Sequence, residues 1–225
     1  MRLAKSREAI GYLSLVFMLA AIYMVFIYAP PDKNLGDIQR IFYFHVSSAW
    51  IAFLAFFLVF VASILYLKSR SRRWDILAHS SAEIGVILTT LVLITGPIWA
   101  RPIWYTWWTW DIRLTTTLVL WLIYVAYLML RSYSEGSRGA RFAAVFAILG
   151  FLDVPIVFMS IRWWRTQHPG PVIGGGEEAG LATPMLYTLF VSLAAFTLLF
   201  IYLLLLRTKL ETIEDEIDHL KRGGH

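Results

Sequence analysis

The sequence predicts an all-α membrane protein with six transmembrane helices, and three observations lead to this fold class. Hydrophobic residues make up 59% of the chain and charged residues only 16%, whereas about a quarter of the residues are charged in an average soluble domain. Six apolar runs each approach the length of about 20 residues that a helix needs to cross a bilayer. Strand-like alternation is absent from these runs, which disfavours a β-barrel. Because lipid offers no water to the backbone, the runs are predicted to be helices.

The six runs divide the chain into a predicted transmembrane domain, residues 1–206, and a tail, residues 207–225. The first run is too long for the hydrophobic part of a signal peptide, so we expect it to remain as an anchor helix. The first, second, fourth and sixth runs contain no charged residue. In chain order, the helices are predicted at residues 10–29, 46–67, 76–97, 114–130, 142–161 and 183–206.

The polar segments between the runs predict the orientation in the membrane. Six helices place both termini on one side together with the segments 68–74 and 131–141, and leave the loops 30–45, 98–113 and 162–182 on the other. Fourteen Lys and Arg residues lie on the first side and six on the second. Cytoplasmic loops carry the excess of Lys and Arg, so both termini are predicted to be cytoplasmic. The net charge of +5 is mostly this bias and gives no sign of nucleic-acid binding.

The predicted tail has apolar residues at helical spacing among many charged ones. These residues are Leu210, Ile213, Ile217 and Leu220. The pattern predicts an amphipathic cytoplasmic helix. Its function is open between a solvated helix and a helix that docks on a cytoplasmic partner.

Tryptophan is concentrated in one short segment, WARPIWYTWWTWDIRLT, residues 99–115. Trp74 is predicted near the inner face and Trp121 within a helix, whereas the other eight tryptophans are predicted at or near the outer face. An interfacial aromatic belt would populate both faces. We therefore expect a ligand or a partner at the outer face. The eight outer residues are Trp50, Trp99, Trp104, Trp107, Trp108, Trp110, Trp163 and Trp164.

Two histidines are predicted on the same side as these tryptophans. His45 lies in FYFHVSSAW at the start of the second run, and His168 lies in WWRTQHPGP after the fifth. Either one taken alone is more typical of a structural or solvated histidine. Together they favour haem, because two opposed imidazoles can fill both axial positions of the iron. The flat macrocycle would then rest on indole rings. The chain has no cysteine, which excludes thiolate ligands.

Arginines close to these tryptophans are candidates for binding the two haem propionates, which guanidinium groups recognise well. Binding to lipid phosphates or pairing with Asp111 is the alternative for each of them. Asp111 is itself a candidate for orienting an arginine or a partner residue. The candidate arginines are Arg101, Arg113, Arg162 and Arg165.

Two acidic residues fall inside predicted helices. Asp153 precedes Pro155 in the fifth run, where a charge is costly unless it is paired or neutral, so a functional role is open. Glu83 lies one turn from His79 near the inner end of the third run, where its side chain can reach water.

The tryptophan-rich segment resembles the WWD signature of the haem-handling proteins of cytochrome c maturation. The flanking IFYFHVSSAW and WWRTQHPG match the histidine segments of that family, and six helices with the signature between the third and fourth are similar to its CcmC branch. The resemblance extends from about Gly36 to Leu206. Tyr105 stands where a glycine is common in the signature, and Pro169 follows His168 directly.

This resemblance implies a function, a cofactor and partners. CcmC-like proteins hold haem at the outer face of the bacterial inner membrane and load it onto the haem chaperone CcmE. They associate with CcmD, CcmB and CcmA. By position, His45 and His168 would ligate the iron of haem b. The remaining expected cofactor-binding residues are Trp99, Arg101, Trp104, Trp107, Trp108, Trp110, Asp111, Arg113, Trp163, Trp164 and Arg165.

Two other classes of membrane protein are alternatives. An electron-transfer anchor usually places histidines inside the bundle on facing helices, whereas His45 and His168 lie at predicted helix ends. A small-molecule permease could use Asp153 and the proline beside it, but such proteins carry internal repeats, which the sequence lacks. No acid–base pair or nucleophile stands out, so we do not expect an enzyme. The expected surroundings are membrane lipid and protein partners.

Overall fold

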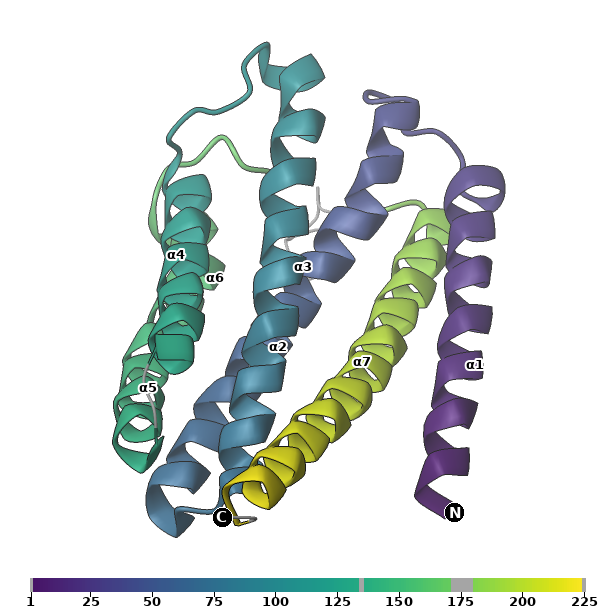
Figure 1. The fold of residues 1–225 in the computed structure, drawn as a ribbon. Coiled ribbons are helices and arrows are strands. Elements are labelled where there is room, and N and C mark those ends of the chain that lie inside the picture. Colours follow the sequence, from purple (N-terminus) through teal and green to yellow (C-terminus); the bar gives the residue numbers. More distant parts are fainter. Residues whose placement is uncertain (1, 134–135, 171–179, 224–225) are drawn as a thin grey trace.

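The computed structural model describes residues 2–133, 136–170 and 180–223. The helices lie side by side in an elongated bundle, and the first helix begins at the same end at which the last one ends (Figure 1). We call this the inner end and the opposite end the outer end, after the predicted orientation. The connections that follow η1 and α3, and the described residues directly after α6, lie at the outer end (Figure 1).

Helices account for every long element in the described part of the chain. In order they are α1 (Arg2–Tyr23), the π-helix η1 (Met24–Tyr28), the 3-10 helix η2 (Asp37–Gln39), α2 (Arg40–Ser69), α3 (Arg72–Trp104), α4 (Ile112–Tyr133), α5 (Gly136–Gly150), α6 (Asp153–Trp163) and α7 (Thr183–Gly223). Among the described residues, 6 segments are long and apolar enough to cross a membrane: Ser6–Tyr28, Asp37–Ser69, Arg72–Trp104, Ile112–Tyr133, Arg138–Trp163 and Thr183–Asp218. The predicted all-α class with six membrane-spanning helices is confirmed.

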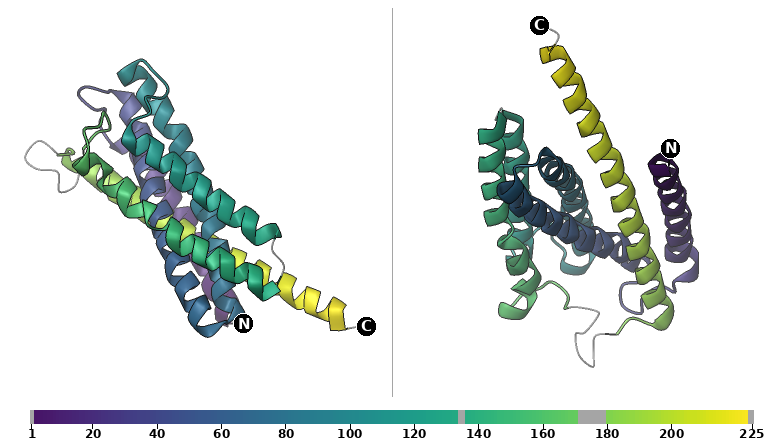
Figure 2. Two further views of the ribbon diagram at one scale, coloured as in Figure 1. Left: turned by 90° about the vertical axis from the view of Figure 1, so that its left-hand side faces the viewer. Right: turned by 90° about the horizontal axis from the view of Figure 1, so that it is seen from below.

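The helices α2 and α3 form the centre of the bundle and share its most extensive contact. Viewed along the bundle, α7 and α1 lie on one side of this pair, and α4, α5 and α6 lie on the other (Figure 2). In the core, the ring of Phe56 stacks on that of Tyr124, with 3.8 Å between the centroids. Gly85 makes this packing possible, because a Cβ atom there would lie 2.6 Å from Cε1 of Phe56.

The helix α3 continues past the predicted end at residue 97 to Trp104, although it contains Pro97 and Pro102. Each proline removes one backbone donor but has a φ angle that a helix tolerates. The helix ends where Tyr105 adopts a left-handed φ of 58° and donates its N–H to the carbonyl of Arg101 at 3.0 Å. Part of the tryptophan-rich segment, expected to be a loop, is therefore helical.

The fifth membrane segment is broken into α5 and α6 by a turn at Phe151 and Leu152. Pro155 fits the first turn of α6 because the N–H groups of a first turn have no partner within their own helix. Asp153 begins this turn, where the helix dipole favours a negative charge. Its Oδ2 is buried and has no hydrogen-bond partner among the described residues.

Ion pairs join three helices at the inner end. Asp75, which is 4% exposed, pairs with Arg72 of its own helix and accepts from Nη2 of Arg131 on α4 at 2.5 Å. Glu211 of α7 pairs with Arg72 at 3.2 Å and with Nδ1 of His79 at 2.9 Å. These contacts hold the inner ends of α3, α4 and α7 together.

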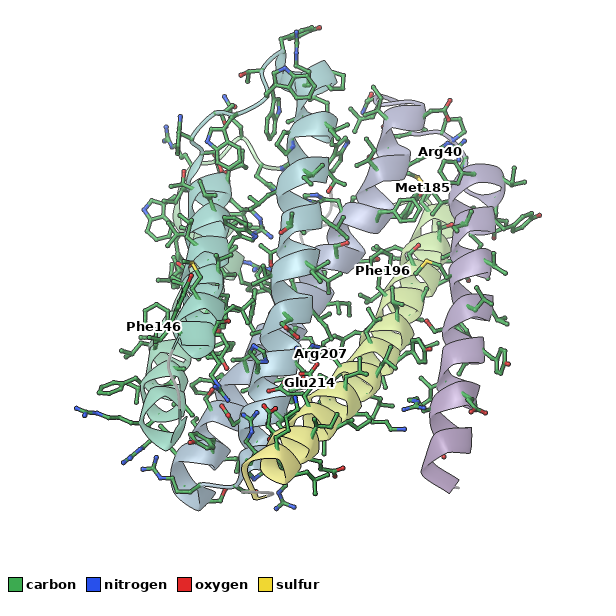
Figure 3. The ribbon with its side chains drawn as sticks, viewed as in Figure 1. Arg40, Phe146, Met185, Phe196, Arg207 and Glu214 are labelled. Atoms are coloured by element: carbon green, nitrogen blue, oxygen red, sulfur yellow. The ribbon has the colours of Figure 1, made fainter. Side chains whose placement is uncertain are left out.

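The segment predicted to be an amphipathic helix continues α7, which runs without interruption to Gly223. The last two residues of the chain lie outside the described ones. Glu83, predicted only to reach water, also forms an ion pair: it accepts from Nε and Nη2 of Arg207 on α7 at 2.5 and 3.0 Å. In Figure 3, Arg207 lies on the inner half of α7 and Met185 near its outer end.

Candidate functional site

A cavity with about 850 Å³ of empty space, part of it open to solvent, lies between the helices in the outer half of the bundle. Its walls come from α2, α3, Trp108 of the loop between α3 and α4, α4, Val157 of α6 and the segment after α6. Most lining side chains are aliphatic or aromatic, and the polar exceptions include His45, His168 and Arg113. The structure thus brings both predicted histidines to one apolar cavity.

His45 is held in one orientation by α3. Its side chain is buried at 8% exposure, and its Nδ1 lies 2.9 Å from Oγ1 of Thr95. That hydroxyl donates its own hydrogen to the carbonyl of Leu91 at 2.7 Å, so it accepts from the imidazole. This hydrogen-bond arrangement assigns the ring hydrogen to Nδ1 and the lone pair to Nε2. Gly96 allows this close approach, because a Cβ atom there would lie 3.3 Å from Cε1 of His45.

His168 reaches the same state with a different partner. Its Nδ1 lies 2.9 Å from the carbonyl oxygen of Pro169, and a carbonyl only accepts, so Nδ1 carries the hydrogen. Burial, together with the positive charge of Arg113, lowers the pKa of His168 to about 4. The ring is consequently neutral at neutral pH, with the lone pair on Nε2.

Asp111 does not line the cavity but fixes the segment that carries His168. Its carboxylate accepts from Oγ1 of Thr166 at 2.7 Å and from the N–H of Gln167 at 3.0 Å. Thr166 in turn accepts the N–H of His168 at 3.0 Å. Asp111 also accepts the N–H of Arg113 at 3.0 Å, which caps the start of α4. This residue thereby joins the tryptophan-rich loop to the His168 segment.

The hydrogen bonds at Asp111 also set its ionisation. Burial raises the pKa of this carboxyl, but the bonds from Thr166, Arg113 and Gln167 outweigh burial, so the pKa lies below its ordinary value. The group that connects the two loops is therefore ionised at neutral pH.

The predicted tryptophans fall into two groups. Trp99, Trp104 and Trp108 line the cavity, and the ring of Trp99 lies 5.9 Å from that of His45. The indole N–H groups of Trp99 and Trp108 are buried without a hydrogen-bond partner among the described residues. Outside the cavity, the structure exposes Trp107 (58%), Trp110 (71%), Trp163 (57%) and Trp164 (48%).

The arginines divide in the same way. Arg113 lines the cavity and its Nη1 donates to the carbonyl of Val157 at 3.3 Å. Arg101 lies outside the cavity over the ring of Trp107, at 5.9 Å from the centroid. Arg162 lies over Phe158 at 5.3 Å, and Arg165 is exposed. Only Arg113 is thus placed against the cavity by the described geometry.

Three residues that matter to this geometry were not predicted. Thr95 and Thr166 hold the two histidine segments, and Gly96 makes room for His45. No sequence pattern marks the two threonines, because each forms a hydrogen bond with a residue that is distant in the sequence and close only in the folded chain. The capping role of Asp111 had a signal, namely an acidic residue placed directly before an apolar helical run.

The geometry can be compared with known proteins. A family model described as "CcmC: Heme exporter protein C" matches residues 2–222. The chain belongs to this family. Membership implies a role in haem handling for cytochrome c maturation. The six membrane-capable segments agree with a multi-pass membrane protein.

Relatives come from bacteria and from a plant. "Heme exporter protein C" of Haemophilus influenzae is 33% identical over 207 residues, which cover 92% of this chain and 84% of the relative. The protein of the same name from Bradyrhizobium diazoefficiens is 37% identical over 195 residues, covering 86% and 74%. A "Putative cytochrome c biosynthesis ccmC-like mitochondrial protein" of Marchantia polymorpha is 33% identical over 177 residues, covering 78% and 75%.

Proposed function

We propose that the chain holds haem b in the outer cavity, with His45 and His168 as the axial ligands of the iron, and delivers it to the haem chaperone CcmE. The observation that carries this proposal is the hydrogen-bonding state of the two imidazoles. Both keep their hydrogen on Nδ1, bound to a protein oxygen, and both leave the Nε2 lone pair for a metal. Two histidines of the same cavity in this state fit a pair of axial ligands.

The other cavity residues fit haem better than a bare metal ion. Among the described residues, no group of three or more His, Asp or Glu side chains converges as a bare ion would require. Two imidazoles suffice for an iron whose four other positions are filled by a porphyrin. The apolar walls suit the macrocycle, and Trp99, Trp104 and Trp108 offer indole faces. Arg113 and the unpartnered N–H groups of two of these indoles are the donors that propionates need.

The exposed tryptophans are better placed for a protein than for haem. Trp107, Trp110, Trp163 and Trp164 lie outside the cavity, and aromatic residues dominate the energetics of protein interfaces. We assign them, with Arg101 and Arg165, to the surface that receives the chaperone. The excess of Lys and Arg at the inner end supports a periplasmic position for this surface. Association with CcmD, CcmB and CcmA forms part of the same proposal.

The role proposed for this chain is binding and transfer of haem rather than catalysis. Haem supplies the iron and the reactive macrocycle. The chain orients the two imidazoles, excludes water from one side of the site and presents an edge to a partner. We assign the reacting groups of any covalent bond between haem and the chaperone to haem and the chaperone, not to this chain.

Spectroscopy of histidine variants tests the ligand assignment. Wild-type protein purified from haem-producing cells should give a low-spin spectrum, and His45→Ala or His168→Ala should each give a weaker or high-spin one. The double variant should retain little haem. His79→Ala is the matched control, because His79 is a largely buried histidine that bonds Glu211 at the inner end, so its spectrum should equal that of the wild type. Unchanged spectra in both outer variants would reject the assignment.

A pair of tryptophan variants separates haem retention from transfer. Trp107→Ala with Trp110→Ala should keep the low-spin spectrum but reduce capture of the chaperone, because both rings lie outside the cavity. Trp99→Ala with Trp108→Ala should lose haem. Equal haem loss in both pairs would contradict the division between the cavity and the partner surface.

A further inference from the structure

The inner part of α7 exposes a continuous apolar stripe that no described residue covers. The exposed fractions are 47% for Leu210, 39% for Ile213, 44% for Ile217 and 77% for Leu220. The helix continues straight from its membrane-spanning part and ends apart from the other helices (Figure 2). At 1.5 Å per residue, α7 is far longer than the hydrocarbon core of about 30 Å. This stripe, which we call the seam, therefore lies at or beyond the membrane surface.

The opposite face of the same helix is anchored to the bundle. Asp215 accepts from Nε and Nη2 of Arg72 at 2.6 and 2.8 Å, and Glu211 bonds Arg72 and His79. At 100° per residue, Glu211 and Asp215 lie on the side of the helix away from the seam. These ion pairs fix the rotation of α7, so the seam points away from α3 and cannot turn inward.

The spacing within the seam is the alternating three-and-four spacing of a coiled-coil heptad, over less than two heptads. Its residues follow one another at intervals of three, four and three, which makes Leu210 and Ile217 the a positions and Ile213 and Leu220 the d positions of a heptad pattern. The positions that flank such a seam decide which helix can pair with it. Here they are the exposed residues Lys209 and Glu216 on one side, and Glu214 and Lys221 on the other. Within the described part of the chain, Glu214 and Lys221 have only long ion pairs, with Arg207 at 3.9 Å and with Asp218 at 4.0 Å.

We propose that the seam pairs with the seam of a second copy of this chain as a short parallel coiled coil. In a parallel pair, each g residue meets the e residue five positions later on the partner. Lys209 then meets Glu214 of the other copy, and Glu216 meets Lys221 of the other copy. All of these contacts join opposite charges, and symmetry doubles them. The seam is thus complementary to itself in the spacing of its apolar residues and in charge.

Parallel pairing agrees with the membrane, since two copies inserted in the same orientation carry their α7 ends on the same side. A free helix of this length would be marginally stable in water. Here the helix is already formed as part of α7 and is held by Arg72. Confinement to one membrane raises the effective concentration of the second copy. Of the residues labelled in Figure 3, Arg207 precedes the proposed paired part and Glu214 lies within it.

Cysteine cross-linking in native membranes tests this pairing, because the natural chain contains no cysteine. Ile213→Cys places a thiol in the seam, and Thr212→Cys places one on the adjacent side of the same helix, outside it. We expect mild oxidation to give a species of twice the chain mass for Ile213→Cys, and little for Thr212→Cys. Ile217→Cys provides a second seam position if Ile213→Cys accumulates poorly. Equal yields inside and outside the seam, or no cross-link at either seam position, would overturn the proposal.

A charge exchange tests the partner. Lys209→Glu in the Ile213→Cys background should lower the cross-linked yield several-fold, and adding Glu214→Lys should restore it because the pair is then reversed in both copies. A cross-linked species of another mass would mean that a different protein covers the seam, and an unaffected yield would mean that charge does not select the partner; either result overturns pairing with a second copy. The haem spectrum should remain that of the wild type throughout, so this proposal and the haem proposal can fail independently.

Discussion

His79 at the inner end and His45 at the outer end are both largely buried imidazoles on long helices, but their partners differ. His79 bonds Glu211, a carboxylate that Arg72 also binds, and the resulting ion pairs hold helices together. His45 bonds the neutral hydroxyl of Thr95 and keeps one nitrogen free toward an apolar cavity. Buried polar groups thus serve the fold at one end and remain available for a ligand at the other.

The same contrast extends to the neighbouring side chains. At the inner end, Asp75 and Glu211 both meet cationic partners. At the outer end, the N–H groups of Trp99 and Trp108 are buried with no partner among the described residues. An unpaired buried donor lowers stability unless water or a ligand satisfies it, and these two donors belong to side chains that line the cavity. Stability and function are therefore expected to respond to different substitutions.

The largest effect on stability is expected from the inner ion pairs. Asp75→Ala leaves Arg72 and Arg131 without their shared carboxylate and should lower the free energy of unfolding by about 3 kcal/mol. Thermal unfolding in detergent measures this loss, and the haem spectrum of the folded fraction should not change. Asp37→Ala is the control, because Asp37 forms an ion pair with Arg40 at the same spacing but is 77% exposed. Its effect should stay below about 1 kcal/mol.

A smaller effect, confined to haem binding, is expected at Thr166. Thr166→Val removes both the hydroxyl that donates to Asp111 and the acceptor of the His168 N–H, and haem affinity should fall about tenfold. Thr166→Ser keeps the hydroxyl and should bind haem like the wild type. Haem titration measures both variants. Loss of affinity in Thr166→Ser as well would show that the methyl group, not the hydrogen bond, matters.

The contribution of the Asp111 hydrogen bonds to haem affinity should not depend on pH near neutrality. Because the pKa of this carboxyl is depressed, its stabilising contribution is present above the ordinary pKa and is lost only as the pH falls through the lowered one. The affinity ratio between wild type and Thr166→Val should therefore be the same at about pH 8 and about pH 5.5. A ratio that declines across this range would contradict an ionised Asp111.

A change of a few-fold in haem affinity is expected at Gly96. Gly96→Ala places a methyl group 3.3 Å from Cε1 of His45, so the imidazole must shift by a few tenths of an ångström. Stability should change little, because the helix gains about 1 kcal/mol from alanine while the crowding costs about as much. Gly170→Ala is the control, since a Cβ atom there meets nothing within 4 Å. Equal haem titrations for both variants would show that His45 tolerates the shift.

The smallest effect is expected at Tyr105. Tyr105→Gly relieves a left-handed backbone conformation at the end of α3 and should raise the free energy of unfolding by about 0.5 kcal/mol, with no effect on haem. Tyr12→Gly is the control, because Tyr12 is also highly exposed (72% against 82%) but lies in the interior of α1. There glycine should destabilise by about 1 kcal/mol. Destabilisation by both variants would mean that Tyr105 contributes contacts that outweigh its strain.

The sequence predicted the helices well and their ends less well. Long apolar runs leave the backbone no choice but a helix in lipid, so all six segments could be recognised. The extension of α3 through Pro97 and Pro102 could not, because whether a helix tolerates a proline depends on what packs around it. The break before Asp153 had a visible cue in Pro155, but its position depends on the packing of α5 and α6.

The candidate site was predictable as a set of residue types but not as an arrangement. His45 and His168 were both expected on the outer side, and the structure places them at one cavity. The separation of the tryptophans was hidden, because the segment crosses from the end of α3 into a loop and its periodicity changes there. The glycine common at the position of Tyr105 had a backbone reason, a φ of 58°, that only the folded chain reveals.

The arrangement at His45 and His168 has a consequence for the chemistry of exchange. Each ring already holds its one hydrogen against a protein oxygen, so an incoming iron displaces none into the solvent and a departing iron requires none in return. Under the ligation proposed above, capture and release of the iron therefore exchange no proton at these rings at any pH at which both are neutral.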